Sequence, residues 1–387
     1  MKQAADVVVL GAGVVGASIA WHLAARGCAD VLVLDREAEP GRGSTCRATG
    51  GFRAQFASDV NVRLSLLARE KLLRFADELG VDPGYRPYGY LFVARGRRGL
   101  DALAEARAVQ RAAGFGEASH VEPEEIARIN PAIAMDGVLG GSHCAADGFI
   151  RPLEILRGYR EGAERLGARF AFGEPCTGFR MRGGRISAVV TPRGEIATGC
   201  VVNAAGPWAA AIGRQAGADV PVTPLRRQVA PTEACDLLPE SMPMTIFVDD
   251  GFHLRVRDRR VLLLCPDQPA GADPFDTRVD DGWRAEVVRR AHERVPCLAP
   301  VPIDVEGCWA GLYEMSPDGH ALLGAAPGVD NLFLANGSSG HGVMHAPALG
   351  HLLAEIILDG AASTIDARPL RPSRFAEGKP NRAPELL

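Results

Sequence analysis

The sequence predicts an α/β protein of two interleaved domains, one built from strand–glycine–helix units and the other mainly antiparallel β. Near the N-terminus an apolar run leads straight into glycine and a helical pattern, and strand–glycine segments return near residues 200–206 and 331–342. Between about residues 221 and 307 the pattern changes to short strands, with one helix near residues 281–293. At 387 residues the chain is also too long for one ordinary core.

The N-terminal segment carries the most informative motif. Residues 7–10 read Val-Val-Val-Leu, an apolar run typical of a strand buried on both faces, and lead directly into Gly11-Ala12-Gly13-Val14-Val15-Gly16. Gly11 permits the tight turn, Gly13 lets the backbone approach a pyrophosphate, and Gly16 lets the following helix pack closely on the strand. The free N–H groups at the start of that helix can hold phosphate charge.

The context of this motif strengthens it. A helix is expected over residues 17–26, and a second apolar strand at residues 31–34 ends in Asp35, which can accept hydrogen bonds from an adenosine ribose. A lone Gly-x-Gly-x-x-Gly could arise by chance among 45 glycines, but here strand, helix, second strand and acid follow in order. We therefore expect a Rossmann-like dinucleotide-binding domain, although the motif alone does not separate NAD from FAD.

The remaining elements follow from periodicity and turn residues. Helices are expected at residues 61–79, 100–113, 153–166 and 346–358, and strands at 88–94, 200–203, 331–335 and in short runs around the turns at 183–184 and 193–194. The dinucleotide-binding domain is therefore assigned to residues 1–80, 149–220 and 308–387, and the second, substrate domain to residues 81–148 and 221–307.

Composition excludes several classes of function. The formal net charge is only −4, from 43 basic and 47 acidic residues, which argues against a nucleic-acid surface. No apolar run approaches the roughly 20 residues needed to span a bilayer, and a strand pattern near the start leaves no room for a secretory signal. Nine scattered cysteines without a Cys-x-x-Cys pair argue against a metal site or a disulfide framework and favour the cytoplasm.

Five blocks of sequence together resemble the D-amino-acid oxidase superfamily of FAD oxidoreductases. They occur in the right order and cover nearly the whole chain: Gly11–Gly16; Gly43-Ser44-Thr45 with Gly50-Gly51-Phe52-Arg53; Asn203–Gly206 with Trp208; Trp309-Ala310-Gly311-Leu312 with Pro317-Asp318-Gly319; and Ser339-Gly340-His341-Gly342. The sarcosine oxidase branch is most similar, especially the β subunits of heteromeric sarcosine oxidase and of dye-linked L-proline dehydrogenase. The resemblance implies FAD in an extended form across a Rossmann-like domain, with the substrate over the flavin ring.

The resemblance also implies a set of cofactor-binding residues. The turn at residues 339–342, with a helix close behind, would place N–H donors and a helix dipole near the negative edge of reduced flavin, although an ordinary glycine turn is the alternative. The full set is Gly11, Gly13, Val14, Val15, Gly16, Asp35, Arg36, Ser44, Thr45, Thr49, Gly50, Gly51, Cys176, Ala205, Gly206, Trp208, Gly311, Ser339, Gly340, His341, Gly342, Val343 and Met344.

Four residues are candidates for the substrate site. Arg53 occupies the position at which sarcosine oxidases place a carboxylate-binding arginine, and a structural ion pair is the alternative. Tyr313 stands where glycine and D-amino-acid oxidases carry an arginine, which favours the sarcosine/proline branch. Met344 replaces a lysine that also holds the carboxylate in monomeric sarcosine oxidase. His253 aligns with a pocket tyrosine of the glycine oxidase type and could orient the amine, although a lone histidine on a strand is more often structural.

Other departures from the family bear on the cofactor and on oxygen. The family's lysine near flavin N5 lies on a strand matching residues 261–265, and that run contains none, so fast oxidase activity is not expected. Family positions for covalent attachment hold Gly311, Arg47 and Arg151 here, and Cys308 is a better core thiol than an attachment site. We expect non-covalent FAD and no covalent FMN.

The resemblance therefore implies oxidation of the C–N bond of a small amino acid or N-methyl amino acid, sarcosine being favoured. A hydride would pass from the carbon next to nitrogen to flavin N5, the imine would hydrolyse, and the electrons would go to O2 or another acceptor. The alternative is a flavin subunit of a hetero-oligomeric L-proline or D-amino-acid dehydrogenase that passes electrons to a partner subunit. An NAD-dependent enzyme with the same opening motif is a weaker third hypothesis.

Overall fold

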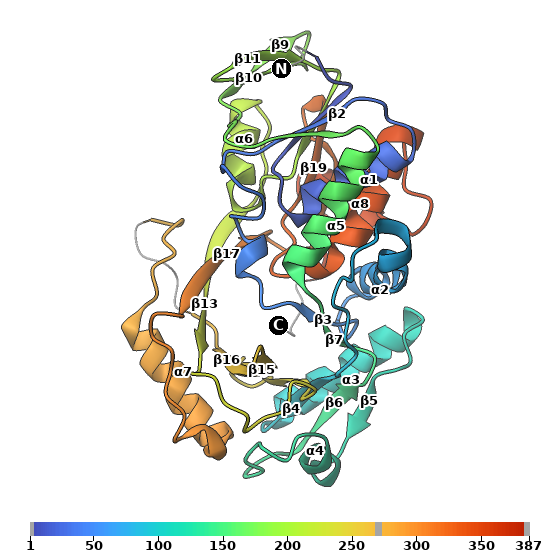
Figure 1. The fold of residues 1–387 in the computed structure, drawn as a ribbon. Coiled ribbons are helices and arrows are strands. Elements are labelled where there is room, and N and C mark those ends of the chain that lie inside the picture. The colour runs from blue at the N-terminus through green and yellow to red at the C-terminus, as the bar shows by residue number, and fades with distance from the viewer. Residues whose placement is uncertain (1–3, 268–272, 383–387) are drawn as a thin grey trace.

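The computed structural model describes residues 4–267 and 273–382 and is built around two large sheets (Figure 1). The first has six strands in the order β18 (Leu322–Ala326), β19 (Val329–Asn336), β12 (Cys200–Asn203), β1 (Val7–Leu10), β2 (Val31–Leu34) and β8 (Arg169–Ala171). All neighbouring pairs are parallel except β18 with β19. The α/β class is confirmed.

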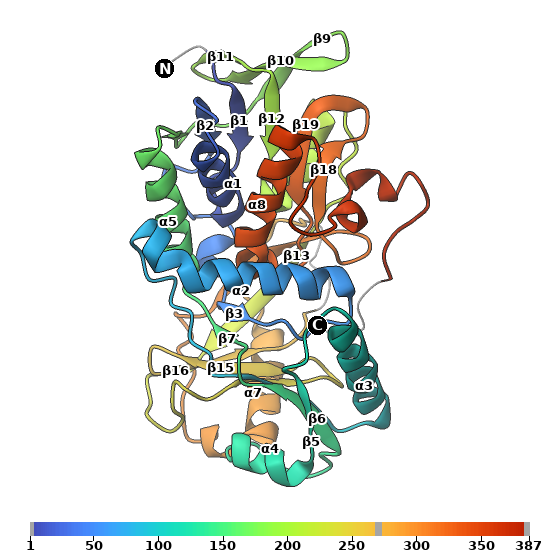
Figure 2. The same ribbon diagram turned by 90° about the vertical axis from the view of Figure 1, so that its right-hand side faces the viewer.

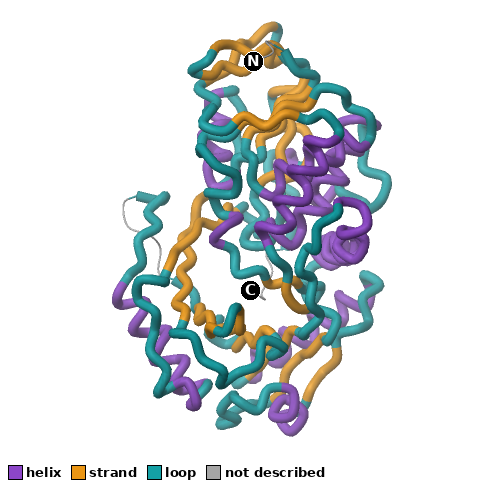
Figure 3. Tube along the Cα trace, in the orientation of Figure 1, coloured by secondary structure: helices purple, strands orange, loops and turns teal. Residues whose placement is uncertain are grey.

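The second sheet has eight strands and is mainly antiparallel. Its order is β17 (Trp309–Met315), β13 (Thr223–Pro231), β16 (Arg260–Leu264), β15 (His253–Arg257), β14 (Met244–Phe247), β4 (Tyr90–Ala94), β6 (Gly140–Cys144) and β5 (Ser119–Val121). Only β14 and β4 run parallel. Figure 3 shows the two groups of strands separated along the long axis of the molecule.

Two smaller sheets complete the strands. The turns predicted at residues 183–184 and 193–194 join β9 (Gly178–Arg182), β10 (Arg185–Thr191) and β11 (Gly194–Ala197) into a three-stranded sheet at one end of the molecule. β3 (Gly51–Phe52) pairs with β7 (Gly148–Phe149) where the chain passes between the two large sheets.

Six of the eight α-helices in the described residues lie close to predicted positions. The eight are α1 (Val14–Ala25), α2 (Asp59–Leu79), α3 (Arg97–Ala112), α4 (Pro123–Ile129), α5 (Pro152–Arg165), α6 (Ala209–Gln215), α7 (Asp281–Arg294) and α8 (Gly342–Asp359). The two short helices α4 and α6 were not predicted. α1 begins three residues earlier than predicted because the end of the glycine motif already forms its first turn. α8 also begins earlier, at Gly342, and keeps Pro347 inside its second turn.

Helices α1, α5 and α8 lie together on one face of the six-stranded sheet, and α2 runs across the molecule below them (Figure 2). α1 is apolar on nearly all sides because it is enclosed between the sheet and these helices, with Ile19 and Leu23 fully buried. Glycine makes the close crossing of α1 and α8 possible, since a Cβ on Gly350 would lie 2.3 Å from Ser18 Oγ. This packing fixes the start of α1 against the strand before it.

The long ribbon of β13 and β17 joins the regions of the two large sheets. The strands pair from Thr223 with Met315 to Val229 with Trp309, and β13 then continues into pairing with β16. β17 therefore belongs to the eight-stranded sheet, although residues 308–387 were assigned to the dinucleotide-binding domain. Its register with β13 is a long-range contact that strand periodicity does not reveal, and the domain boundaries stay a prediction.

Candidate active site

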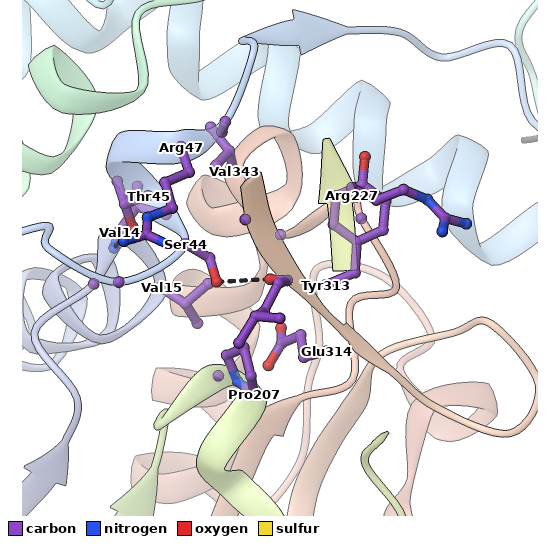
Figure 4. Close-up of a pocket in the computed structure, with 18 of the residues that line it drawn as sticks. Val14, Val15, Ser44, Thr45, Arg47, Pro207, Arg227, Tyr313, Glu314 and Val343 are labelled. Carbon is purple, nitrogen blue, oxygen red and sulfur yellow. Dashed lines mark hydrogen bonds between the residues drawn. The ribbon is translucent and has the colours of Figure 1, made fainter. Parts of the chain in front are cut away.

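One cavity of about 630 Å³ extends from the β1–α1 turn, past the end of β12, to β15 and β16. All the predicted cofactor-binding residues line it except Gly16, and all four predicted substrate-site residues line it too. Figure 4 shows Val14, Val15 and Thr45 on one side of the cavity and Tyr313 with Arg227 on another. Both large sheets contribute to its wall, so residues distant in the sequence share one space.

The glycine motif forms the close turn that the sequence predicts. Gly11 has φ of 110°, and a Cβ there would lie 2.4 Å from the carbonyl oxygen of Ala204. A Cβ on Gly16 would lie 1.9 Å from the carbonyl oxygen of Gly11. Gly16 therefore acts through the packing of α1 on β1, which explains why it does not line the cavity with the other motif residues.

Two side chains hold this turn in place. The N–H of Val14 donates to Thr45 Oγ1 at 3.1 Å. Asp35 accepts from the N–H groups of Ala12 at 2.7 Å and Glu37 at 2.9 Å, while burial raises the pKa of its carboxyl group. The acid at the end of β2 thus lies against the glycine turn, at the place where the motif predicts the adenosine ribose.

A second turn faces the cavity at the start of α8. Ser339 and Gly340 both have positive φ, of 50° and 94°, and a Cβ on Gly340 would lie 2.4 Å from Tyr313 Cε2. Tyr313 therefore packs directly on the turn that the resemblance assigns to the flavin. The first N–H groups of α8 follow at once, so backbone donors and the positive end of the helix dipole point to the same part of the cavity.

Arg53 is a deeply buried cation in the described structure. Its side chain is 3% exposed and lies 4.3 Å from the centroid of the Phe56 ring. Its guanidinium donates to the carbonyl oxygen of Gln55 at 3.2 Å and contacts His341 Nε2 at 3.3 Å. Burial lowers its pKa, and Arg53 forms no ion pair with any carboxylate in the part of the chain that the structure describes.

Asp147 is a buried acid whose charge acts on Arg53, but its carboxylate is hydrogen-bonded to other groups. It accepts from the N–H of Ala54 at 2.8 Å and from the Gln55 amide at 3.1 Å. Burial raises the pKa of Asp147 to about 6, despite these donors and the charge of Arg53. The alternative of a structural ion pair for Arg53 is therefore not realised by this acid.

His253 lies on β15 as a neutral ring. Its Nδ1 is 2.9 Å from the carbonyl oxygen of Gly251, which can only accept, so Nδ1 carries the proton and Nε2 is left as an acceptor. Burial, together with the positive charges of Arg227 and Arg53, lowers the pKa of His253 to about 4. An imidazole in this state can accept a hydrogen bond from a substrate amine.

Several residues of the cavity wall were not among the predicted site residues, and Tyr90, Arg227 and Glu314 are three of them that carry a hydroxyl or charged group. Tyr90 lies inside an apolar strand pattern, which predicts a side chain of the hydrophobic core. In the structure, a Cβ on Gly51 would lie 2.0 Å from the hydroxyl oxygen of Tyr90. Gly51 is thus the residue that makes room for the tyrosine hydroxyl. Glu314 could have been found from the sequence, because it directly follows the predicted site residue Tyr313 after the Trp-Ala-Gly block.

Glu314 is a buried acid with an unused oxygen. Its Oε1 accepts from the N–H of Ser338 at 3.2 Å, whereas Oε2 has no partner within the described residues. Burial raises the pKa of Glu314 to about 7. A buried oxygen without a partner is costly, and the hydroxyl-rich chain of a bound dinucleotide could satisfy it. This observation fits a dinucleotide in the cavity.

We predict a pH effect on the cofactor-free protein from Glu314. Because folding raises this pKa, stability is full below the unfolded value of about 4.3 and is lost as pH rises through about 7. Glutamine does not titrate, so Glu314→Gln should lack this pH-dependent loss of stability. The Tm of the wild type should therefore fall relative to that of the variant by roughly 2–5 °C from pH 5 to pH 8. Thermal unfolding across this range measures it, and parallel curves for the two proteins would contradict the assignment.

The comparisons with known proteins decide the family. The model of the DAO family, described as FAD dependent oxidoreductase, matches residues 6–356. The chain belongs to this family. FAD is therefore its cofactor, and the glycine motif, the Asp35 carboxylate and the turn before α8 are the parts of the cavity that fit it.

Similar proteins agree with this assignment. The bovine FAD-dependent oxidoreductase domain-containing protein 1 is 29% identical over 97% of this chain and 86% of its own length. Human mitochondrial sarcosine dehydrogenase is 30% identical over 93% of this chain, which covers only 40% of that longer protein. The crystal structure of L-proline dehydrogenase from P. horikoshii superposes with a TM-score of 0.91 at 28% identity, over 98% of this chain and all of that one. Family and fold are thus confirmed.

Proposed function

We propose that this chain oxidises the C–N bond of a small amino acid or N-methyl amino acid, with sarcosine as the first substrate to test. The observation that carries the proposal is Arg53, a buried cation without a carboxylate partner among the described residues. It lines the same cavity as the turn at residues 339–342, which is called the flavin turn below. A charge in this position is costly until an anion neutralises it. The carboxylate of an amino acid is such an anion, and the guanidinium can bind it with two parallel hydrogen bonds.

The other residues of this end of the cavity suit an amine. The chemistry that FAD supplies when bound is acceptance of a hydride at flavin N5. His253 offers Nε2 as an acceptor to the amine, and the rings of Tyr313 and Tyr90 enclose the space. No strong base is needed when the amine binds in its neutral form, and the imine product hydrolyses in water. Relatives named for sarcosine and proline support the same substrate class.

A second candidate is a flavin subunit of a hetero-oligomeric L-proline or D-amino-acid dehydrogenase. The cavity-lining residues of β16 and the segment after it are Leu264, Cys265 and Pro266, with no lysine among them. The similarity to the L-proline dehydrogenase structure favours this candidate over a rapid oxidase. A partner subunit or another acceptor would then take the electrons, and we propose a cytoplasmic location for either form. Within the described residues, no helix is long and apolar enough to cross a membrane.

The test is a visible spectrum of the purified holoprotein, recorded without oxygen before and after adding sarcosine. We expect the flavin bands to bleach, because two electrons from the substrate reduce the cofactor. L-Proline and a panel of D-amino acids are the comparison substrates. Readmitting air separates the two candidates, since slow recovery with fast dye reduction indicates a dehydrogenase. Flavin bands that persist with every amino acid would reject the proposal.

A further inference from the structure

Two adjacent arginines on β13 face opposite ways. Arg226 does not line the cavity, and its Nε lies 2.8 Å from Asp267, a carboxylate that is 3% exposed. Arg227 is partly buried and lines the cavity, and as a neighbour of Arg226 on a strand it points to the other face of the sheet. One arginine is thus used in a structural ion pair, and the other faces the space proposed for the substrate.

Arg227 has no acidic partner. Its guanidinium carbon lies 5.5 Å from the centroid of the Tyr313 ring, and its Nη1 donates to the carbonyl oxygen of Arg226 at 3.2 Å. It forms no ion pair with any residue that the structure describes. In Figure 4 the side chain lies beside the Tyr313 ring, away from Ser44 and Val15. The remaining N–H groups are therefore available to a ligand in the cavity.

Each acidic side chain that lines the cavity interacts with a group other than Arg227. Glu314 follows Tyr313 on β17 and so points to the other face of the ribbon, where it accepts from Ser338. The remaining acids each have a partner of their own, namely Asp35 with the glycine turn, Glu37 with Arg36 and Glu174 with Arg193. No carboxylate of the described chain neutralises Arg227.

Arg53 and Arg227 act on the same space. Both line the same cavity as His253 and Tyr313, and the Arg227 guanidinium lies 5.5 Å from the centroid of the Tyr313 ring. Consistent with this placement, the positive charges of both arginines lower the pKa of His253. Sarcosine carries one carboxylate and would leave one of the two cations unneutralised. A ligand with two anionic groups would neutralise both, and guanidinium groups are well suited to bind carboxylates.

We propose that Arg227 binds a second carboxylate of the substrate, so that the preferred substrate is an amino or N-methyl amino acid with an acidic side chain. This inference rests on the proposed function and narrows its substrate class. Arg53 holds the carboxylate next to the reacting carbon, and Arg227 holds the distal one beside Tyr313. Neutral amino acids, sarcosine included, are weaker substrates because they lack the distal charge.

Binding is tested first, with ligands that cannot be oxidised. Succinate and glutarate are compared with their monoamides, succinamate and glutaramate, which have similar size and one charge less. The shift of the flavin absorbance of the holoprotein gives each Kd. We expect the wild type to prefer the diacid by about tenfold, the value of a hydrogen-bonded charge pair. Arg227→Met should reduce this ratio to about one, and Arg227→Lys should keep part of it.

A matched control removes the same charge elsewhere. Arg182 is exposed on β9, in the three-stranded sheet, and Arg182→Gln should leave the diacid preference unchanged. A similar loss of preference in Arg182→Gln would assign the effect to net charge and overturn the proposal. Loss of FAD from Arg227→Met would also overturn it, since Arg227 would then be a cofactor contact.

Reduction of the flavin completes the test. Aspartate and glutamate, with and without an N-methyl group, are compared anaerobically with asparagine, glutamine and sarcosine. Faster bleaching by the acids, lost in Arg227→Met, supports the proposal. If sarcosine bleaches the flavin, and aspartate and glutamate bleach it no faster than asparagine and glutamine, the role of Arg227 is rejected while the proposed function stands. If no amino acid bleaches it, the proposed function fails, and the diacid ratio alone decides whether Arg227 binds an anion.

Discussion

Arg53→Met should raise the amino-acid concentration that half-reduces the flavin by about 100-fold, while FAD stays bound. The methionine fills a similar volume between the Phe56 and Phe92 rings but offers no donor to the substrate carboxylate. An anaerobic titration with sarcosine, or with the best substrate of the panel, measures the effect. The ratio of flavin to protein absorbance shows whether the cofactor remains.

The thermal stability of the same variant separates the two interpretations of Arg53. A cation in a structural ion pair would leave an uncompensated buried acid when removed, and Tm would fall sharply. A cation kept for a ligand has no such partner, so Tm of the substrate-free protein should stay close to the wild-type value. Unchanged titration with a lowered Tm would contradict the carboxylate-binding role.

Gly16→Val should give the largest loss of both stability and cofactor. Even a Cβ at this position would lie 1.9 Å from the carbonyl oxygen of Gly11, so α1 must move away from β1. We expect a cost of at least about 3 kcal/mol and a protein purified without yellow colour, because the displaced helix no longer presents its N–H groups to the cavity. FAD content and Tm are the measurements.

Gly199→Ala is the matched control for this prediction. Gly199 precedes β12 in the same sheet region, and a Cβ there would meet nothing within 4 Å. The variant should keep its FAD and its Tm nearly unchanged. A Gly16→Val protein that retains FAD like Gly199→Ala would show that the turn tolerates displacement of α1, against the packing argument.

The parts of the site that could be predicted from the sequence are those in which a short segment determines its own structure. The turn at residues 11–16 is one, since strand, glycines and helix are contiguous and the steric requirement at each glycine is local. Arg53 and the turn at residues 339–342 were found because the resemblance placed them by position. The six longer helices were predicted to within a few residues from their apolar periodicity, whereas the seven-residue helices α4 and α6 are too short to show one and were missed.

The residues that escaped prediction depend on contacts between distant strands. Arg227 looks no different from Arg226 in the sequence, and only the folded structure, in which β13 pairs with β16 and β17, shows that Arg227 lines the cavity and Arg226 does not. Tyr90 lies within the apolar run of β4, and its role follows from the approach of Gly51. Tertiary register of this kind is not encoded in any local pattern.

The ribbon of β13 and β17 has a consequence for how substrate preference could diversify. Arg227 lies opposite Gly311 in the register, and Tyr313 is its diagonal neighbour on the same face. The spacing between the distal anion site and the flavin turn is therefore set by a hydrogen-bonded ladder, not by a loop. Insertions in the connections at either end of the ribbon leave this spacing untouched, whereas an exchange of one side chain on β13 changes selectivity directly. The ribbon thus keeps the distance between these side-chain positions constant, so single substitutions on it can change substrate preference while the fold stays the same.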